Sequence, residues 1–248
     1  RGTVYIEGGS THVTDSTFAN NTAVNGSGIY IEGSNTVISG SDFDSNNASE
    51  NGAGVYIKGD NTKIISGSSF ENNTAVNGAG VYVVGKNTEF SDSTYEYNNA
   101  TNGGAIYING QSSTINSNTF DHNNVSNHGG AVYIEGSGTS ISSNTFTNNE
   151  AVAISADGTE GLGGAIYVKG DNTKTDSNDF EHNKARNGSA IYTDGTNFVL
   201  TGDTFKENQA WSYLLIVTPK PEESYYNQSD VNITVLHVGG DNIINAIH

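Results

Sequence analysis

Residues 103–125 read GGAIYINGQSSTINSNTFDHNNV, and this stretch contains the two phrases that decide the fold. The first is Ile106-Tyr107-Ile108, in which apolar residues flank a tyrosine with the alternation of a β-strand. The second is Phe120, followed three residues later by Asn123. Glycine, serine and asparagine stand between these phrases and favour turns. The stretch predicts short strands joined by tight turns, without a helical period.

Both phrases recur in step along the chain. The tyrosine phrase recurs at Tyr5, Tyr30, Tyr56, Tyr82, Tyr107, Tyr133, Tyr167 and Tyr192. Successive tyrosines are 25, 26, 26, 25, 26, 34 and 25 residues apart. The aromatic-x-x-Asn phrase recurs at Phe18, Phe43, Phe70, Tyr95, Phe120, Phe146, Phe180 and Phe205. A fixed period of this size is typical of a solenoid, because a propeller blade needs about 40 residues.

This period fits one coil of a parallel β-helix. We predict an all-β, right-handed parallel β-helix of about eight coils, with about 25 residues and three strands per coil. The helix should cover residues 1–210, because the pattern ends at Trp211. Residues 211–248 should form a C-terminal cap or the start of a following β module.

Composition narrows the classes of function. The 10 basic and 27 acidic residues give a formal charge of −17, which is the opposite of what a nucleic-acid-binding protein needs. The chain has no cysteine, so the redox compartment stays open. No apolar run approaches the roughly 20 residues of a membrane span. Because the chain opens with Arg1 and without a signal peptide, we expect it to be an excised fragment.

In a stack of coils, equivalent positions form columns, and the tyrosine column is the first candidate site. The apolar neighbours of each tyrosine should point inward, so the tyrosines should point outward as a flat stripe. The stripe either binds sugar rings or a protein partner, or only strengthens the strand stacking. The candidate ligand-binding residues are Tyr30, Tyr56, Tyr82, Tyr107, Tyr133, Tyr167 and Tyr192. By contrast, the Asn, Phe and Ile/Val columns should be structural.

A second candidate is the acidic column one residue after the aromatic, formed by Asp44, Glu71, Glu96 and Asp121. Oxygen ligands suit calcium, but the sequence lacks a recognised calcium loop. We therefore expect a solvated acidic edge and no cofactor. His122 and His182 lie two coils apart in the sequence pattern, too far to share a metal ion.

Two other features stand outside the columns. Between Glu150 and Leu162 about eight extra residues predict a loop that bulges from one corner, either for recognition or as a neutral insertion. N-glycosylation sequons occur at Asn20, Asn25, Asn47, Asn72, Asn99, Asn124, Asn187, Asn227 and Asn232. In so Asn- and Thr-rich a chain, chance alone would produce many of these motifs.

The repeat resembles known surface proteins. The phrases Gly103-Gly104-Ala105-Ile106 and Phe-x-x-Asn are similar to the repeats of polymorphic outer-membrane proteins. The Asn-rich version seen here, with Val-Gly-Gly-Asp-Asn-Ile-Ile-Asn-Ala-Ile at residues 238–247, is more similar to adhesin-like surface proteins of methanogenic archaea. The resemblance covers about residues 1–210. It implies a right-handed β-helix at the cell surface and attachment to other cells, and it supplies no catalytic residues.

These observations together predict a non-enzymatic adhesin module. Its partner would be a glycan or protein on another cell, and the chain would be extracellular and monomeric. A structural stalk that presents another binding domain is the alternative. A polysaccharide lyase or hydrolase is a third interpretation, but catalytic residues should interrupt the repeat on neighbouring coils, and little of that pattern is present. An ice-binding surface is disfavoured because its threonine column is interrupted by Asp42 and Asp179.

Overall fold

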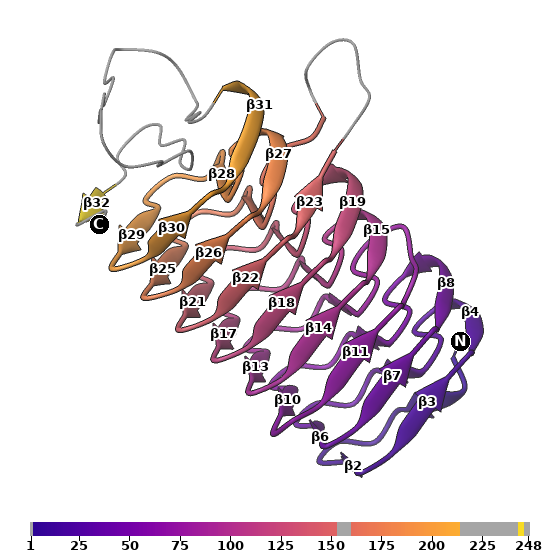
Figure 1. Ribbon diagram of the computed structural model, residues 1–248. Coiled ribbons are helices and arrows are strands. Elements are labelled where there is room, and N and C mark those ends of the chain that lie inside the picture. Colours follow the sequence, from indigo (N-terminus) through magenta and orange to yellow (C-terminus); the bar gives the residue numbers. More distant parts are fainter. Residues whose placement is uncertain (1, 153–159, 214–242, 246–248) are drawn as a thin grey trace.

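The chain winds into a stack of coils that runs as a rod from the first strands to β30 (Figure 1). The structure, a computed structural model, describes residues 2–152, 160–213 and 243–245. Every regular element in these residues is a strand. Accordingly, the described ranges contain no helix that is long and apolar enough to cross a membrane. The predicted all-β parallel solenoid with about eight coils is confirmed.

Three main sheets run along the rod. The first, sheet A, contains the tyrosine strands β1 (Val4–Ile6), β5 (Ile29–Ile31), β9 (Val55–Ile57), β12 (Val81–Val83), β16 (Ile106–Ile108), β20 (Val132–Ile134), β24 (Ile166–Val168) and β28 (Ile191–Thr193). Sheet B contains β2 (His12–Thr14), β6 (Val37–Ser39), β10 (Lys63–Ile65), β13 (Glu89–Ser91), β17 (Thr114–Asn116), β21 (Ser140–Ser142), β25 (Lys174–Asp176), β29 (Val199–Thr201) and β32 (Ile243–Asn245). Sheet C contains the aromatic strands β3 (Thr17–Ala19), β7 (Asp42–Asp44), β11 (Ser69–Glu71), β14 (Thr94–Glu96), β18 (Thr119–Asp121), β22 (Thr145–Thr147), β26 (Asp179–Glu181) and β30 (Thr204–Lys206).

A fourth set of short strands differs from the predicted three strands per coil. These are β4 (Thr22–Asn25), β8 (Asn47–Asn51), β15 (Asn99–Asn102), β19 (Asn124–His128), β23 (Glu150–Ala151), β27 (Lys184–Asn187) and β31 (Gln209–Tyr213). We call the set sheet D; it is divided into a pair and a group of five. Sheet D is separate from sheet C because a residue in the left-handed conformation follows each aromatic strand, for example His122 with φ 51°. That residue turns the chain, so the phrase predicted as one strand forms two.

The register stacks like residues on like residues. Tyr107 pairs with Tyr133, and Phe120 pairs with Phe146, both in parallel ladders. The insertion does not disturb this register, because Tyr133 still pairs with Tyr167 and Phe146 with Phe180. Residues 153–159 of the predicted loop lie outside the described residues. The columns inferred from the sequence are therefore real columns in space.

The core lies between the three main sheets. Ile106 and Ile108, on either side of Tyr107, are fully buried, as are most of their equivalents on other coils. The aromatic rings of sheet C stack along the rod with ring centroids 4.6–5.1 Å apart. Burying one such side chain contributes roughly 1.5–3 kcal/mol, so this column is a main source of stability. Tyr95 replaces Phe in the column, and its buried hydroxyl has no hydrogen-bond partner.

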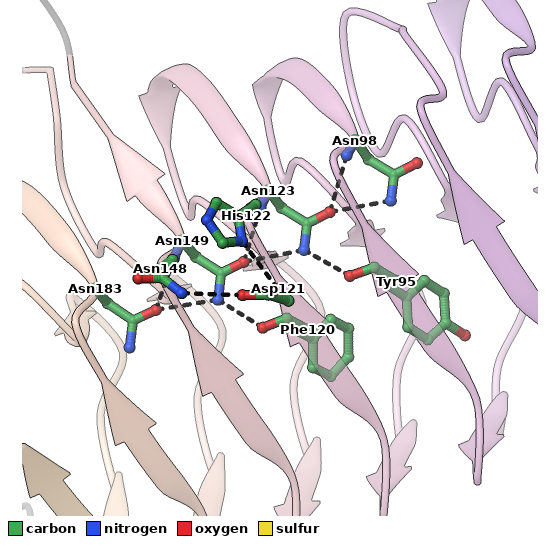
Figure 2. Close-up of polar contacts among 9 residues, drawn as sticks. All are labelled: Tyr95, Asn98, Phe120, Asp121, His122, Asn123, Asn148, Asn149 and Asn183. Carbon is green, nitrogen blue, oxygen red and sulfur yellow. Dashed lines mark hydrogen bonds and ion pairs between the residues drawn. The ribbon is translucent and has the colours of Figure 1, made fainter.

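An asparagine ladder fixes the turn after each aromatic strand (Figure 2). The Asn123 amide group donates to Asn149 Oδ1 at 2.9 Å and to the Tyr95 carbonyl at 2.9 Å. Its Oδ1 accepts from both the backbone N–H and the side chain of Asn98, at 3.1 and 3.0 Å. The same pattern repeats at Asn73, Asn98, Asn149 and Asn183. Each amide thus satisfies buried backbone groups on neighbouring coils.

The C-terminal segment returns to the solenoid in its described part. Strand β31 pairs with β27 and crosses the predicted boundary between residues 210 and 211. Strand β32 pairs with β29 as the last strand of sheet B. Residues 214–242 and 246–248, which include most of the predicted cap, lie outside the described residues.

Candidate interaction surface on the tyrosine strands

The tyrosines lie on the outer side of sheet A, away from the main core. Tyr107, Tyr133, Tyr167 and Tyr192 form a separate cluster with Leu162, against which Tyr82 also packs. Their rings continue the register of the strands, and adjacent ring centroids from Tyr5 to Tyr192 are 4.4–5.8 Å apart. Most of these pairs are stacked with interplanar angles of 6–21°. The ring faces therefore lie against other tyrosines.

The tyrosines leave the sheet on its outer side, as predicted, but the stripe that they form is closely packed. The four tyrosines from Tyr107 to Tyr192 are only 6–9% exposed. Tyr30, Tyr56 and Tyr82 are half-buried and form the more accessible part of the column. Burial and the neighbouring Tyr30 and Tyr82 raise the pKa of Tyr56 to about 12. The alternation of side chains along the strand predicts on which side of the sheet the rings lie. The packing of ring on ring depends on the spacing between coils.

Charged residues two positions after the tyrosines tie the hydroxyls to the next coil. Tyr107 donates a hydrogen bond to Glu135 Oε2 at 2.8 Å, and Tyr167 donates to Asp194 Oδ2 at 2.6 Å. Lys169 Nζ lies 2.8 Å from Glu135 Oε1. Hydrogen bonds from Lys169 and Tyr107 lower the pKa of Glu135 below its ordinary value. The charged residues beside the tyrosines are therefore largely paired within the rod. Each exposed ion pair among them contributes only modestly to the free energy of folding.

A second asparagine ladder borders the tyrosines, and sequence reasoning missed it. The side chain of Asn51 donates a hydrogen bond to Asn25 Oδ1. In the same way Asn77, Asn102 and Asn127 each donate to the asparagine on the preceding coil, and the donor–acceptor distances are 2.9–3.1 Å. The recurring Asn-Gly pairs were the available signal, but they were interpreted only as turns. Their glycines do have positive φ, 55–60° at Gly26, Gly52, Gly78, Gly103 and Gly188.

This ladder stops where the insertion enters. The column that holds Asn102 continues with His128, Leu162 and Asn187. Asn127 Oδ1, His128 Nδ1 and Asn187 Oδ1 are buried without a hydrogen-bond partner in the structure. His128 stacks on Tyr167 with centroids 4.8 Å apart, and burial lowers its pKa to about 4. His128 is therefore a neutral packing residue at neutral pH.

The acidic column is also formed, on the outer face of sheet C. Glu71 pairs in register with Asp44 and Glu96, and Glu96 pairs with Asp121. Partial burial and the like charges of Asp121 and Glu71 raise the pKa of Glu96. His122 Nδ1 lies 2.9 Å from Asp121 (Figure 2), whereas His182 lies beside Glu181 and Glu207. Across the described residues, the structure contains no group of three or more acidic or histidine side chains that could hold a metal ion.

Comparison with known families identifies the architecture. Residues 2–162 and 76–234 each match the family model described as "right handed beta helix region". The chain belongs to the right-handed β-helix family. This match confirms the predicted handedness of the coils. No curated protein and no solved structure matched the chain significantly.

One buried polar pair interrupts the core of this right-handed β-helix. Thr175 is the polar exception in the aliphatic column of sheet B and is fully buried. Its hydroxyl donates to Asp203 Oδ2 at 2.6 Å, while Asn178 donates to Asp203 Oδ1 from its backbone and side chain. Asp203 stands where Asn144 and Asn178 stand on earlier coils and accepts the same bonds. The exception therefore satisfies a buried carboxylate one coil away.

Replacing Asp203 by Asn should make the right-handed β-helix more stable at neutral pH. Burial raises the pKa of Asp203, although the bonds from Thr175 and Asn178 partly oppose the shift. The charged form is thus penalised in the folded state, and this group's contribution to stability falls as pH rises through its folded pKa. Chemical unfolding between about pH 3 and pH 8 should show that the advantage of Asp203→Asn shrinks toward the ordinary carboxyl pKa of about 3.9.

A matched control is Asp171→Asn, because hydrogen bonds from the Thr196 backbone and hydroxyl hold the pKa of exposed Asp171 below its ordinary value. That substitution should not stabilise the protein at neutral pH. A lower stability of Asp203→Asn over the whole pH range would contradict the expected sign.

Proposed function

We propose that this right-handed β-helix is a non-enzymatic stalk in a cell-surface protein and holds a binding part away from the cell. The observation that carries the proposal is the use of both aromatic columns to join coils. The core rings stack at 4.6–5.1 Å and the outer tyrosines at 4.4–5.8 Å. A ring face that lies against another ring cannot also stack on a sugar. The aromatic surface is therefore used for cohesion of the rod.

The connections between coils suit a stiff spacer. Strands of sheets A, B and C link each coil to the next with hydrogen-bonded parallel ladders. Asn123 and its equivalents add side-chain bonds within the same stack. Eight coils at about 4.8 Å per coil give a rod on the order of 40 Å long. Each coil contacts only its neighbours, so length can change by whole coils without altering the cross-section.

The residues that interrupt the repeat columns have structural roles, and this supports a non-enzymatic function. An active site in a repeat protein is expected where polar residues interrupt the columns. Here the interruptions at Thr175 and Asp203 bond to each other, and Leu162 packs against the tyrosine cluster. Glu135, which accepts a hydrogen bond from the Tyr107 hydroxyl, is paired with Lys169. These side chains hold coils together and converge on no common point.

The surface location is supported by the repeat's similarity to adhesin-like surface proteins and by the formal charge of −17, which favours solubility and self-repulsion. We expect the rod to be monomeric and to need no cofactor.

An adhesin is the second candidate function, and the exposure of the first coils favours it. Tyr30, Tyr56 and Tyr82 are half-buried, unlike the four tyrosines that follow. Their edges and hydroxyls would contact a glycan or protein of another cell. In that case the stripe acts at one end of the rod and not along its whole length.

The two functions separate in an attachment assay with the full-length protein on its source cells. Tyr30→Ser combined with Tyr56→Ser removes two of these three more accessible rings, and the corresponding Phe pair is the control that keeps the stack. A stalk should retain attachment within about twofold, because loss of a binding hot spot costs about 2 kcal/mol or more. In parallel, the purified chain should bind no glycan or cell-wall polysaccharide, with calcium or with chelator. Saturable binding that the Ser pair loses and the folded rod otherwise retains would replace the stalk with the adhesin.

A further inference from the structure

The structure divides the N-glycosylation sequons into two groups. Asn25 belongs to the ladder beside the tyrosines, where it donates to Glu50 and accepts from Asn51, and Asn187 lies in the same column beyond the insertion and is 8% exposed. The acceptor atom of N-glycosylation is the side-chain nitrogen, which in these two residues is engaged or enclosed. The remaining sequons in the described residues have exposed asparagines: Asn20, Asn47, Asn72, Asn99 and Asn124. Asn227 and Asn232 lie outside the described residues.

The exposed sequons occupy one corner of the rod, between sheets C and D, with one on each of the first five coils. Asn20 and Asn72 stand at the left-handed turn directly before the ladder asparagine. Asn47, Asn99 and Asn124 stand directly after it, as the first residues of β8, β15 and β19. In register, this second position reads Thr22, Asn47, Thr74, Asn99 and Asn124. Thr22 and Thr74 are the sequon threonines of Asn20 and Asn72.

The fold does not require asparagine at these positions. The left-handed turn position holds Ser45, Tyr97 and His122 on other coils with the same positive φ. The strand position holds Glu150, Lys184 and Gln209 on the last three coils. Wherever the strand position is asparagine, the turn position is a different residue. At this corner, each of the first five coils therefore carries one exposed acceptor asparagine, and the last three coils carry no sequon.

We propose that this corner is an N-glycosylated edge, with Asn20, Asn47, Asn72, Asn99 and Asn124 as acceptors of an oligosaccharide. This inference rests on the proposed surface location, because the transfer needs a sugar donor on a lipid diphosphate at a membrane. The asparagine Nδ2 forms a bond to the anomeric carbon, and the bond from that carbon to the diphosphate oxygen breaks. The diphosphate leaves with the bonding electron pair, and the proton lost from Nδ2 offsets one of its negative charges.

The spacing predicts which acceptors interfere. The acceptor alternates between the turn position and the strand position along the first four coils, so glycans on these neighbouring coils start from different positions in the coil. Asn99 and Asn124 are the exception, since they pair directly in register and lie about 4.8 Å apart. These two sites should therefore compete, and each should be only partly occupied. The glycans would cover one corner and leave sheet B and the tyrosine edge uncovered.

The test is glycopeptide mass spectrometry on the full-length protein purified from its source cells. Glycans on the five corner residues, and their absence from Asn25 and Asn187, are expected. Thr101→Ala should abolish the glycan on Asn99 and raise occupancy of Asn124, whereas Thr101→Ser should preserve both. Unmodified corner residues, or equal modification of Asn25 and Asn187, would overturn the proposal.

Labelling of intact cells with an impermeant reagent distinguishes the two levels of failure. A labelled but unglycosylated protein overturns the glycosylated edge and leaves the surface stalk standing. A protein that is neither labelled nor glycosylated overturns both.

Discussion

Asn123→Ala should lower the free energy of unfolding by about 4 kcal/mol. The substitution removes the acceptor of the Asn98 backbone N–H and side chain, and the donor to the Tyr95 carbonyl and to Asn149. All of these groups are buried, and each buried polar group left unpaired costs about 1–3 kcal/mol. Denaturant unfolding measures the total. Hydrogen exchange should show that the loss of protection is centred on the coils of β14, β18 and β22.

Two neighbouring asparagines provide controls for this prediction. Asn124→Ala changes an exposed side chain of the same type and should stay within about 0.5 kcal/mol of wild type. Asn21 stands at the first position of the ladder and is half-buried: it donates to Asn46 on the coil that follows, and its Oδ1 accepts only from the exposed Thr3 hydroxyl instead of from a preceding ladder asparagine. Asn21→Ala should therefore cost less than Asn123→Ala. Equal effects at Asn123 and Asn124 would show that the ladder contributes little.

Gly110→Ala should also be strongly destabilising, with an expected loss of about 3 kcal/mol or more. A Cβ atom on Gly110 would lie 1.9 Å from the carbonyl oxygen of Gly85 on the preceding coil. The obstacle is backbone, which cannot rotate away as a side chain does, so the coils must separate. Separation would lengthen the ladder bonds of the adjacent strands β12 and β16. Thermal and denaturant unfolding should both report the loss.

Gly8→Ala is the matched control because Gly8 occupies the same column on the first coil. A Cβ atom there would meet no atom within 4 Å. The two substitutions have the same chemistry and the same local sequence pattern, and they differ in whether a coil lies beneath them. A loss at Gly8 as large as at Gly110 would point to a local turn requirement instead of contact between coils.

The sequence by itself determined the parallel β-helix. A period of 25 or 26 residues with two phrases in step fixed the coil, and strand alternation fixed which side chains face the core. Because each residue packs on its equivalent one period away, the columns of Phe, Tyr and Asn followed from spacing alone. Thus even the eight-residue insertion was placed correctly between two intact coils.

The tertiary structure decided what each column does. The stacking of the outer tyrosines, the second asparagine ladder and the pairing of Thr175 with Asp203 depend on side-chain directions and distances between coils. The same holds for the sequons, of which Asn25 is bound in a ladder while Asn47 is exposed. A repeat period assigns residues to columns, but it does not set ring orientation, turn geometry or the approach of one coil to the next. Those quantities arise from packing, and they separate the residues that hold the rod together from those that solvent and partners can reach.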